Sequence, residues 1–216
     1  MEHGIAQLPA HDGLQARRRV GLSDGMLRLR TPTSDAWAEV VAGDLTSFLK
    51  DHAANERKVS TSALTLAVHY PDRRPLVDAM IELAREELSH FARVYALLVA
   101  RGHTLGQDAP DAYMRAVRRL VRKRDVEEYL VDRLIVYGVV EARACERFAL
   151  LGRTLPDADL REFYRGLARV EARHHGLFLR LAHRYASCRA VSTRLGEVLD
   201  AEATIVARLP VRAALH

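Results

Sequence analysis

Two short motifs pair a glutamate with a histidine three residues later, Glu87-Leu88-Ser89-His90 and Glu171-Ala172-Arg173-His174. Residues at this spacing project from the same face of a helix, so each motif can present a carboxylate and an imidazole to one point. Carboxylates and imidazoles together bind divalent metals such as iron and manganese. Each motif therefore predicts part of a metal site.

Two lone glutamates, Glu56 and Glu141, extend this pattern. Each lies on the apolar stripe of its own predicted helix and precedes one of the motifs, so the same order of residues occurs twice. The repetition is typical of a duplicated helix pair. The two glutamates would bridge two metal ions or complete their ligand sets.

The predicted placement of these glutamates in an apolar core requires a compensating charge. An ionised carboxylate costs several kcal/mol when it is buried without a partner. The basic residues on the same stripes are His52, His90 and His174, which are too few to neutralise four carboxylates. Two metal ions would supply the charge. The alternative is that the helices are phased differently and the glutamates face solvent.

Prolines, glycines and capping residues divide the chain into long helical stretches without strand alternation. Four long helices are predicted at Asp44–His69, Pro75–Arg101, Asp125–Leu151 and Asp157–Ser187. Shorter ones are predicted at Ser34–Ala42, Asp111–Arg122 and Ala190–Arg208. Apolar residues at i, i+3 and i+4 give each long helix one buried stripe. The expectation is an all-α protein: a four-helix bundle with short accessory helices over residues 34–210, after an irregular segment at 1–33.

The composition restricts the class of protein. Of the 216 residues, 49% are hydrophobic, enough to bury a core, but no run is long enough to span a membrane. Arg17, Arg18 and Arg19 are not followed by the apolar stretch of a secretion signal. Cys145 and Cys188 cannot form a disulfide framework or a zinc finger, so a cytoplasmic location is expected.

At these residues the chain resembles the ferritin-like di-iron carboxylate proteins. The segment His52-Ala53-Ala54-Asn55-Glu56-Arg57-Lys58, together with Glu87-Leu88-Ser89-His90 and the chain length, resembles the tRNA 2-methylthio-N6-isopentenyladenosine hydroxylase family. The resemblance implies hydroxylation, with dioxygen, of the isopentenyl group of a modified adenosine next to the anticodon. It also implies that two iron ions are bound by Glu56, Glu87, His90, Glu141, Glu171 and His174.

Electrons for this reaction would come from another protein. Oxygen-rich ligation suits both oxidation states of iron, and only two nitrogen ligands leave positions open for dioxygen. The chain has neither the glycine fingerprint of a dinucleotide site nor the cysteines of an iron–sulfur cluster. A separate reductase is therefore expected, with the chain itself a monomer or a small homo-oligomer.

Three residues lie one helical turn from the lone glutamates. His52, before Glu56, would orient its carboxylate or would be an ordinary core histidine. Tyr137, before Glu141, would hydrogen-bond a ligand, serve in electron transfer or simply pack. Cys145 is expected to be a small core residue rather than a ligand.

A basic segment suggests a nucleic-acid contact. Arg115, Arg118, Arg119 and Arg122 would share one face of the helix predicted at Asp111–Arg122, and no acidic residue lies among them. The net charge of +5 agrees with an acidic partner, so this face, with Arg73 and Arg74, is the predicted site for tRNA phosphates. The alternative is a solvated face without a partner.

Other activities share the same ligand set. A ferritin-like di-iron or di-manganese oxidase or peroxidase acting on a small molecule would have these ligands but no use for the arginine face. An iron-storage or ferroxidase subunit would need to assemble into a shell. Native mass distinguishes storage from the other two.

Overall fold

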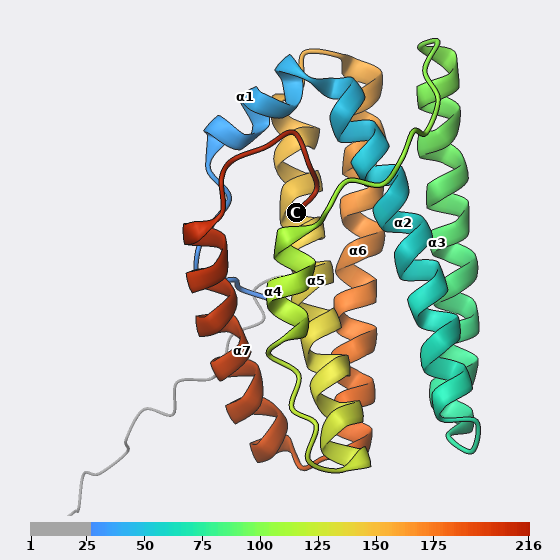
Figure 1. Cartoon of the computed structure of the whole chain (residues 1–216), viewed down its shortest axis with the longest axis vertical. Coiled ribbons are helices and arrows are strands. Elements are labelled where there is room, and N and C mark those ends of the chain that lie inside the picture. Colours follow the sequence, from blue (N-terminus) through green and yellow to red (C-terminus); the bar gives the residue numbers. More distant parts are fainter. Residues whose placement is uncertain (1–26) are drawn as a thin grey trace, which may run out of the picture.

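The computed structural model describes residues 27–216, which form seven α-helices and no β-strand (Figure 1). In chain order the helices are α1 (Asp35–Gly43), α2 (Leu45–His69), α3 (Arg74–Ala100), α4 (Ala112–Arg118), α5 (Val126–Thr154), α6 (Ala158–Tyr185) and α7 (Cys188–Arg208). The all-α prediction is confirmed. The segment predicted as irregular, 1–33, lies mostly outside the described residues, and its part at 27–33 contains no helix.

The four long helices form two hairpins, α2 with α3 and α5 with α6, that lie side by side in one bundle (Figure 1). The two helices of each hairpin pack closely, whereas α2 and α5 approach each other much less. The short helix α4 lies in front of α5 and contacts α7, which packs along the outside of α5.

Side chains at the predicted caps fix where the long helices begin. Asp44, Asp125 and Asp157 each accept a hydrogen bond from a backbone N–H in the first turn of α2, α5 and α6. Pro75 lies in the first turn of α3, where its missing N–H is not needed. Ser34 precedes α1 but its side chain makes no such bond. The caps set the register in which the buried stripes face inward.

The predicted helix Asp111–Arg122 is wrong in its C-terminal part, because α4 ends at Arg118. The backbone N–H of Arg122 donates to Asp132 Oδ2 at 2.9 Å instead of continuing the helix, and the Arg122 guanidinium donates to the same carboxylate. Arg194 of α7 holds Asp132 from the other side. Because the Arg122 N–H donates to this buried carboxylate, residues 119–125 do not continue α4.

The core of the bundle consists of apolar clusters on either side of a polar layer. The largest lies toward the α2–α3 turn and contains residues such as Leu66, Met80 and Leu134. The next contains Phe48 and Phe148 and lies toward the other end. Both follow the predicted stripes. No helix in the described part of the chain is long and apolar enough to cross a membrane.

Gly152 marks a close approach of α5 to α6. An added Cβ would lie 2.8 Å from Arg165 Cγ and 3.1 Å from the Arg165 backbone nitrogen. We expect Gly152→Ala to lower the free energy of unfolding by about 1–3 kcal/mol, because a helix backbone cannot withdraw. Gly166→Ala, whose Cβ would meet nothing within 4 Å, should raise it by about 0.5–1 kcal/mol. Denaturant unfolding measures both, and equal stability of the two variants would contradict the close packing.

Candidate metal centre

The six predicted ligands meet in the middle of the bundle although they come from four helices. Glu56 lies on α2 and Glu141 on α5, while α3 and α6 each contribute one Glu-x-x-His motif. None of the six residues is more than 5% exposed. The alternative of solvent-facing glutamates is therefore excluded.

The ligand atoms form two overlapping groups, each with atoms within 4.8 Å of one another. One group is Glu56, Glu87, His90 and Glu171, and the other is Glu87, Glu141, Glu171 and His174. Glu87 and Glu171 belong to both groups, so they would be the shared ligands if each group held a metal ion. Glu56 and Glu141 each belong to one group, which favours the second of their two predicted roles, completing a ligand set.

Both imidazoles direct Nδ1 at the carboxylates. His90 Nδ1 lies 3.2 Å from Glu87 Oε2 and 3.5 Å from Glu171 Oε1. His174 Nδ1 lies 3.0 Å from Glu171 Oε2 and 2.8 Å from Glu87 Oε1. Each histidine thus faces its own glutamate and the glutamate of the other motif, as a two-metal site requires.

The pKa values of two of the carboxyl groups are raised when no metal is bound. Burial raises the pKa of Glu141 well above its ordinary value, and the charges of Glu171 and Glu87 raise it further. Burial, reinforced by Glu56, also raises the pKa of Glu87. Both shifts work against ionisation, and metal binding would displace any proton that these groups hold.

The pKa values of the two imidazoles are also raised, which favours their charged form. Burial opposes their charge, but Glu56 and Glu87 raise the pKa of His90 to about 10, and Glu171 and Glu87 raise that of His174 to about 12. Burial also opposes the charge of Glu56, yet hydrogen bonds from His52 and His90 lower its pKa to about 2. Positive charge therefore stabilises this group of carboxylates. In the absence of metal, the protons on His90 and His174 supply it.

The donor set fits two metal ions with a preference for oxygen ligands. Two enclosed oxygens, Glu87 Oε1 and Glu171 Oε1, lie near His174 Nδ1 and His90 Nδ1 but accept no well-aligned hydrogen bond from the described residues. A void of about 20 Å³ lies among the four glutamates. Four carboxylates and two imidazoles suit iron or manganese, whereas structural zinc sites use four ligands rich in thiolate and imidazole.

His52 lies one helical turn before Glu56 on α2 and contacts its carboxylate. Its Nε2 is 2.6 Å from Glu56 Oε1, and its Nδ1 is 3.2 Å from the Tyr164 hydroxyl. The imidazole is completely buried. Of the two predicted roles for His52, this geometry favours orienting the Glu56 carboxylate.

Sequence reasoning missed the role of Glu86, which lies off the buried stripe. Glu86 Oε2 is 2.7 Å from His174 Nε2, the ring nitrogen that faces away from the cluster. The Glu86 side chain is 47% exposed, so it links a buried imidazole to the surface. A carboxylate at this position fixes the ring orientation of a metal-binding histidine. The role of Glu86 becomes visible only from the packing of α3 against α6, because its spacing along α3 does not indicate a contact with His174.

The two residues near Glu141 have packing contacts. Tyr137 lies with its ring 5.6 Å from that of Phe178 and makes no hydrogen bond to Glu141. The Cys145 thiol donates to the Ala168 carbonyl at 3.1 Å and belongs to neither ligand group. Cys145 thus behaves as the predicted core residue.

A pocket of about 720 Å³ leads from the surface to the cluster between α2, α4 and α5. Glu141 lines it, and part of its wall is apolar, with Val59, Leu66 and Phe178 among the side chains there. This pocket could not be predicted from the sequence, because residues of five helices and of the segment after α7 form it.

Cations surround the mouth of this pocket. Arg115, Arg118, Arg119 and Lys123 line it, are exposed and form no ion pair with any described residue. Arg122, predicted to share their face, instead binds Asp132 and Glu128. Among the other predicted cations, Arg73 pairs with Glu127 and Arg74 with Asp78.

A four-helix bundle with four glutamates and two matched histidines in its core is the architecture of the ferritin-like di-metal carboxylate proteins. Within this class, residues 22–216 match the family described as tRNA-(MS[2]IO[6]A)-hydroxylase (MiaE), and the chain belongs to that family.

Similar proteins agree with this assignment. The tRNA 2-(methylsulfanyl)-N(6)-isopentenyladenosine(37) hydroxylase of Pseudomonas putida is 43% identical over 73% of this chain and 76% of its own length. The protein of the same name from Salmonella typhimurium is 35% identical over 72% of this chain, which matches only 56% of that protein's length. A solved structure, "Protein 43 with aldehyde deformylating oxygenase activity from Synechococcus", superposes with a TM-score of 0.83 at 34% identity. The superposition covers 87% of this chain and 94% of the Synechococcus chain.

The ligand groups predict a metal content of two per chain. Anaerobic loading with ferrous iron, desalting and metal analysis should give about two irons per chain, because two groups of four ligands are present. Glu171→Ala removes a shared ligand and should lower the content more than Glu141→Ala, which removes an unshared one. One zinc ion or no metal in the unaltered protein would contradict the two-metal site.

Glu141 should destabilise the metal-free fold. Its pKa is raised on folding, so the free energy of unfolding of the metal-free protein should fall as pH rises above the unfolded value near 4.5. Glu141→Gln removes this titration and should be the more stable protein at neutral pH, with a smaller fall. Denaturant unfolding from pH 4 to 8 measures both, with the exposed Glu162→Gln as control. Parallel curves for all three proteins would contradict the buried charge.

Proposed function

We propose that this protein hydroxylates the isopentenyl group of 2-methylthio-N6-isopentenyladenosine next to the anticodon of tRNA, using dioxygen and two iron ions. The observation that carries the proposal is the pocket, which joins an unpaired basic surface to the carboxylate cluster. The names of the relatives in Pseudomonas putida and Salmonella typhimurium support the same substrate. A tRNA substrate implies a cytoplasmic location.

The pocket suits a modified base with an aliphatic arm. Its volume of about 720 Å³ lies in the range of small-molecule sites, and the apolar side chains Val59, Val140 and Phe178 fit a prenyl group. A base attached to tRNA must leave the stack to enter, which costs little in an exposed loop. The arm would then point at Glu141 and the metal ligands.

The cations at the mouth of the pocket would provide affinity for the rest of the tRNA. Arg115, Arg118, Arg119 and Lys123 have no acidic partner in the described part of the chain, so they remain available for phosphates. Arg122 is not among these cations, because Asp132 holds it. Through its bond to Asp132, Arg122 instead fixes the path of the segment that carries Arg119 and Lys123.

Iron bound by the six ligands would activate dioxygen for insertion of one oxygen atom into an unactivated C–H bond, chemistry that side chains alone cannot supply. Glu87 and Glu171 would hold both metals, and Glu56 and Glu141 one each. The apolar clusters on either side keep bulk water from the layer. Two electrons come from a separate donor protein.

Product analysis tests the function. The iron-loaded protein is incubated with tRNA that carries the modified adenosine, dioxygen and a chemical reductant, and the nucleosides are analysed by mass spectrometry. We expect a product heavier by one oxygen atom in the isopentenyl group. Hydroxylation of a free aldehyde or alkane in place of the tRNA would favour a small-molecule oxidase. Assembly into a large shell would favour iron storage.

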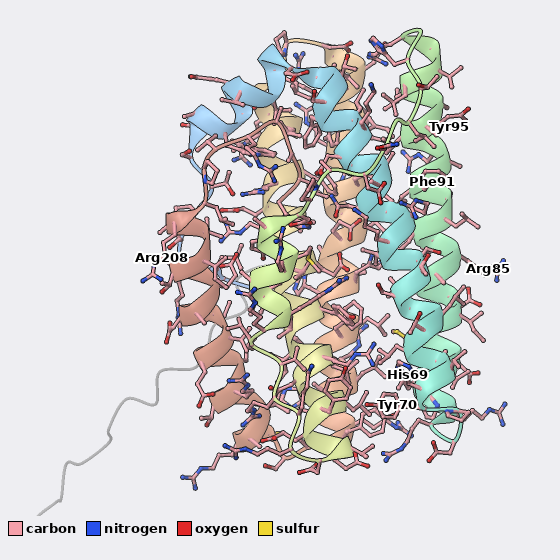
Figure 2. All side chains as sticks on the ribbon, viewed as in Figure 1. His69, Tyr70, Arg85, Phe91, Tyr95 and Arg208 are labelled. Carbon is pink, nitrogen blue, oxygen red and sulfur yellow. The ribbon has the colours of Figure 1, made fainter. Side chains whose placement is uncertain are left out.

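The arginines of the pocket mouth should control tRNA affinity. Arg118→Ala with Arg119→Ala should flatten the dependence of log K on log salt by up to about two units and raise the KM for tRNA. The control is Arg85→Ala with Arg208→Ala, two exposed arginines that lie on the outer sides of α3 and α7 (Figure 2). Filter binding over a range of salt measures the slope. An unchanged slope in the first variant would show that Arg118 and Arg119 are solvated and do not contact tRNA.

A further inference from the structure

The segment that follows α7, residues 209–216, returns across the bundle and ends beside α4 (Figure 1). Side chains of three different helices hold its backbone. The Trp37 indole N–H donates to the Ala214 carbonyl at 3.1 Å, and the Leu215 N–H donates to Asp51 Oδ2 at 2.7 Å. The Arg147 guanidinium donates to the Leu215 carbonyl. The position of the next residue, His216, is therefore fixed.

The His216 ring stacks on Tyr113 of α4. The ring centroids are 4.7 Å apart and the planes differ by 15°. Tyr113 is itself anchored, because its hydroxyl donates to Glu202 Oε1 at 3.1 Å and Arg143 holds the same carboxylate. The stack leaves the edge of the imidazole as its functional side.

His216 lies where the large pocket narrows toward the metal layer. Five residues line both the pocket of about 720 Å³ and the void of about 20 Å³ among the glutamates. These residues form the neck between them: Asn55, Val59, Val140, Glu141 and His216. A substrate that reaches the cluster through the pocket must pass this neck.

Among the enclosed polar atoms of the neck, one has no hydrogen-bond partner in the described part of the chain. Val59 and Val140 are apolar, Glu141 belongs to the ligand set, and the Asn55 amide donates to Asp51. His216 Nδ1 is enclosed and has no hydrogen-bond partner among the described residues. An enclosed nitrogen without a partner costs stability unless a bound molecule completes it.

We propose that His216 determines substrate specificity by hydrogen-bonding, through Nδ1, the nitrogen edge of the purine at the neck of the pocket. The inference rests on the proposed function. The neck is the place for this contact, because the arm on N6 must continue to the metal layer while the purine remains in the wider pocket. His216 thereby sets the depth to which the base enters.

The ionisation of His216 agrees with this role. Burial, together with the positive charges of Arg147 and Arg143, lowers its pKa well below the ordinary value. The ring is therefore neutral and offers one N–H and one lone pair. A purine with a substituted N6 amine offers a donor and acceptors on the matching edge.

Two variants separate the hydrogen bond from the stack. His216→Phe keeps an aromatic ring on Tyr113 but removes Nδ1, while His216→Asn keeps a polar atom near Nδ1 but removes the ring. The probe is the isolated nucleoside N6-isopentenyladenosine, whose binding to the metal-free protein is measured by calorimetry. We expect His216→Phe to weaken binding roughly 5- to 30-fold, as for a lost hydrogen bond that leaves a buried group unsatisfied. His216→Asn should stay within about threefold of the unaltered protein.

Controls distinguish this role from a structural one. Iron content and the salt dependence of tRNA binding should be unchanged in both variants, because the ligands and the mouth are untouched. His216→Phe should unfold at the same temperature as the unaltered protein or slightly above it, because it loses an unsatisfied nitrogen and keeps the stack. With tRNA, His216→Phe should also release less hydroxylated product per dioxygen consumed. The exposed His183→Phe is the matched control and should behave as the unaltered protein.

The outcomes separate the two proposals. If the unaltered protein hydroxylates tRNA and His216→Phe binds the nucleoside equally well, the role of His216 is overturned and the proposed function stands. If His216→Phe and His216→Asn lose binding equally, the ring and not Nδ1 matters, which also overturns it. If the unaltered protein neither binds the nucleoside nor modifies tRNA, both proposals fail.

Discussion

The structure depends on the placement of four carboxylates in one layer of an apolar core. Each would cost several kcal/mol alone, and together they repel one another. The bundle tolerates them because two imidazoles with raised pKa values supply positive charge, as metal ions bound at the ligand groups would. The apolar clusters on both sides must then be large enough to hold the helices together around this layer. The long, capped helices meet that requirement.

The burial of the six candidate ligands could be predicted because helical periodicity is local. Once a helix is recognised between its cap and its end, the phase of its apolar stripe follows from the spacing of the apolar residues. A mid-stripe glutamate then has to face the core. That inference needs no knowledge of how the helices are arranged, which is why it gives the candidate ligands but not which of them belong to both groups.

Features that depend on packing between helices could not be predicted in this way. The basic segment looked like a continuous helical face because no acidic residue interrupts it, yet Asp132 of the next helix captures Arg122 and ends the regular helix early. Glu86 looked irrelevant from its position on α3, but α6 brings His174 to it. The pocket and its neck require a segment far along the chain to return to α4.

The arrangement of ligands gives the centre two different sides. Both histidines come from α3 and α6, and Glu86 closes the outer side of His174. The pocket lies on the other side, between α2, α4 and α5. In the proposed function, a substrate in this pocket would approach past Glu141, which belongs to one ligand group only. A carboxylate can change its mode of binding more easily than an imidazole fixed by a second carboxylate, so the adaptable side of the centre would be the side that meets the substrate.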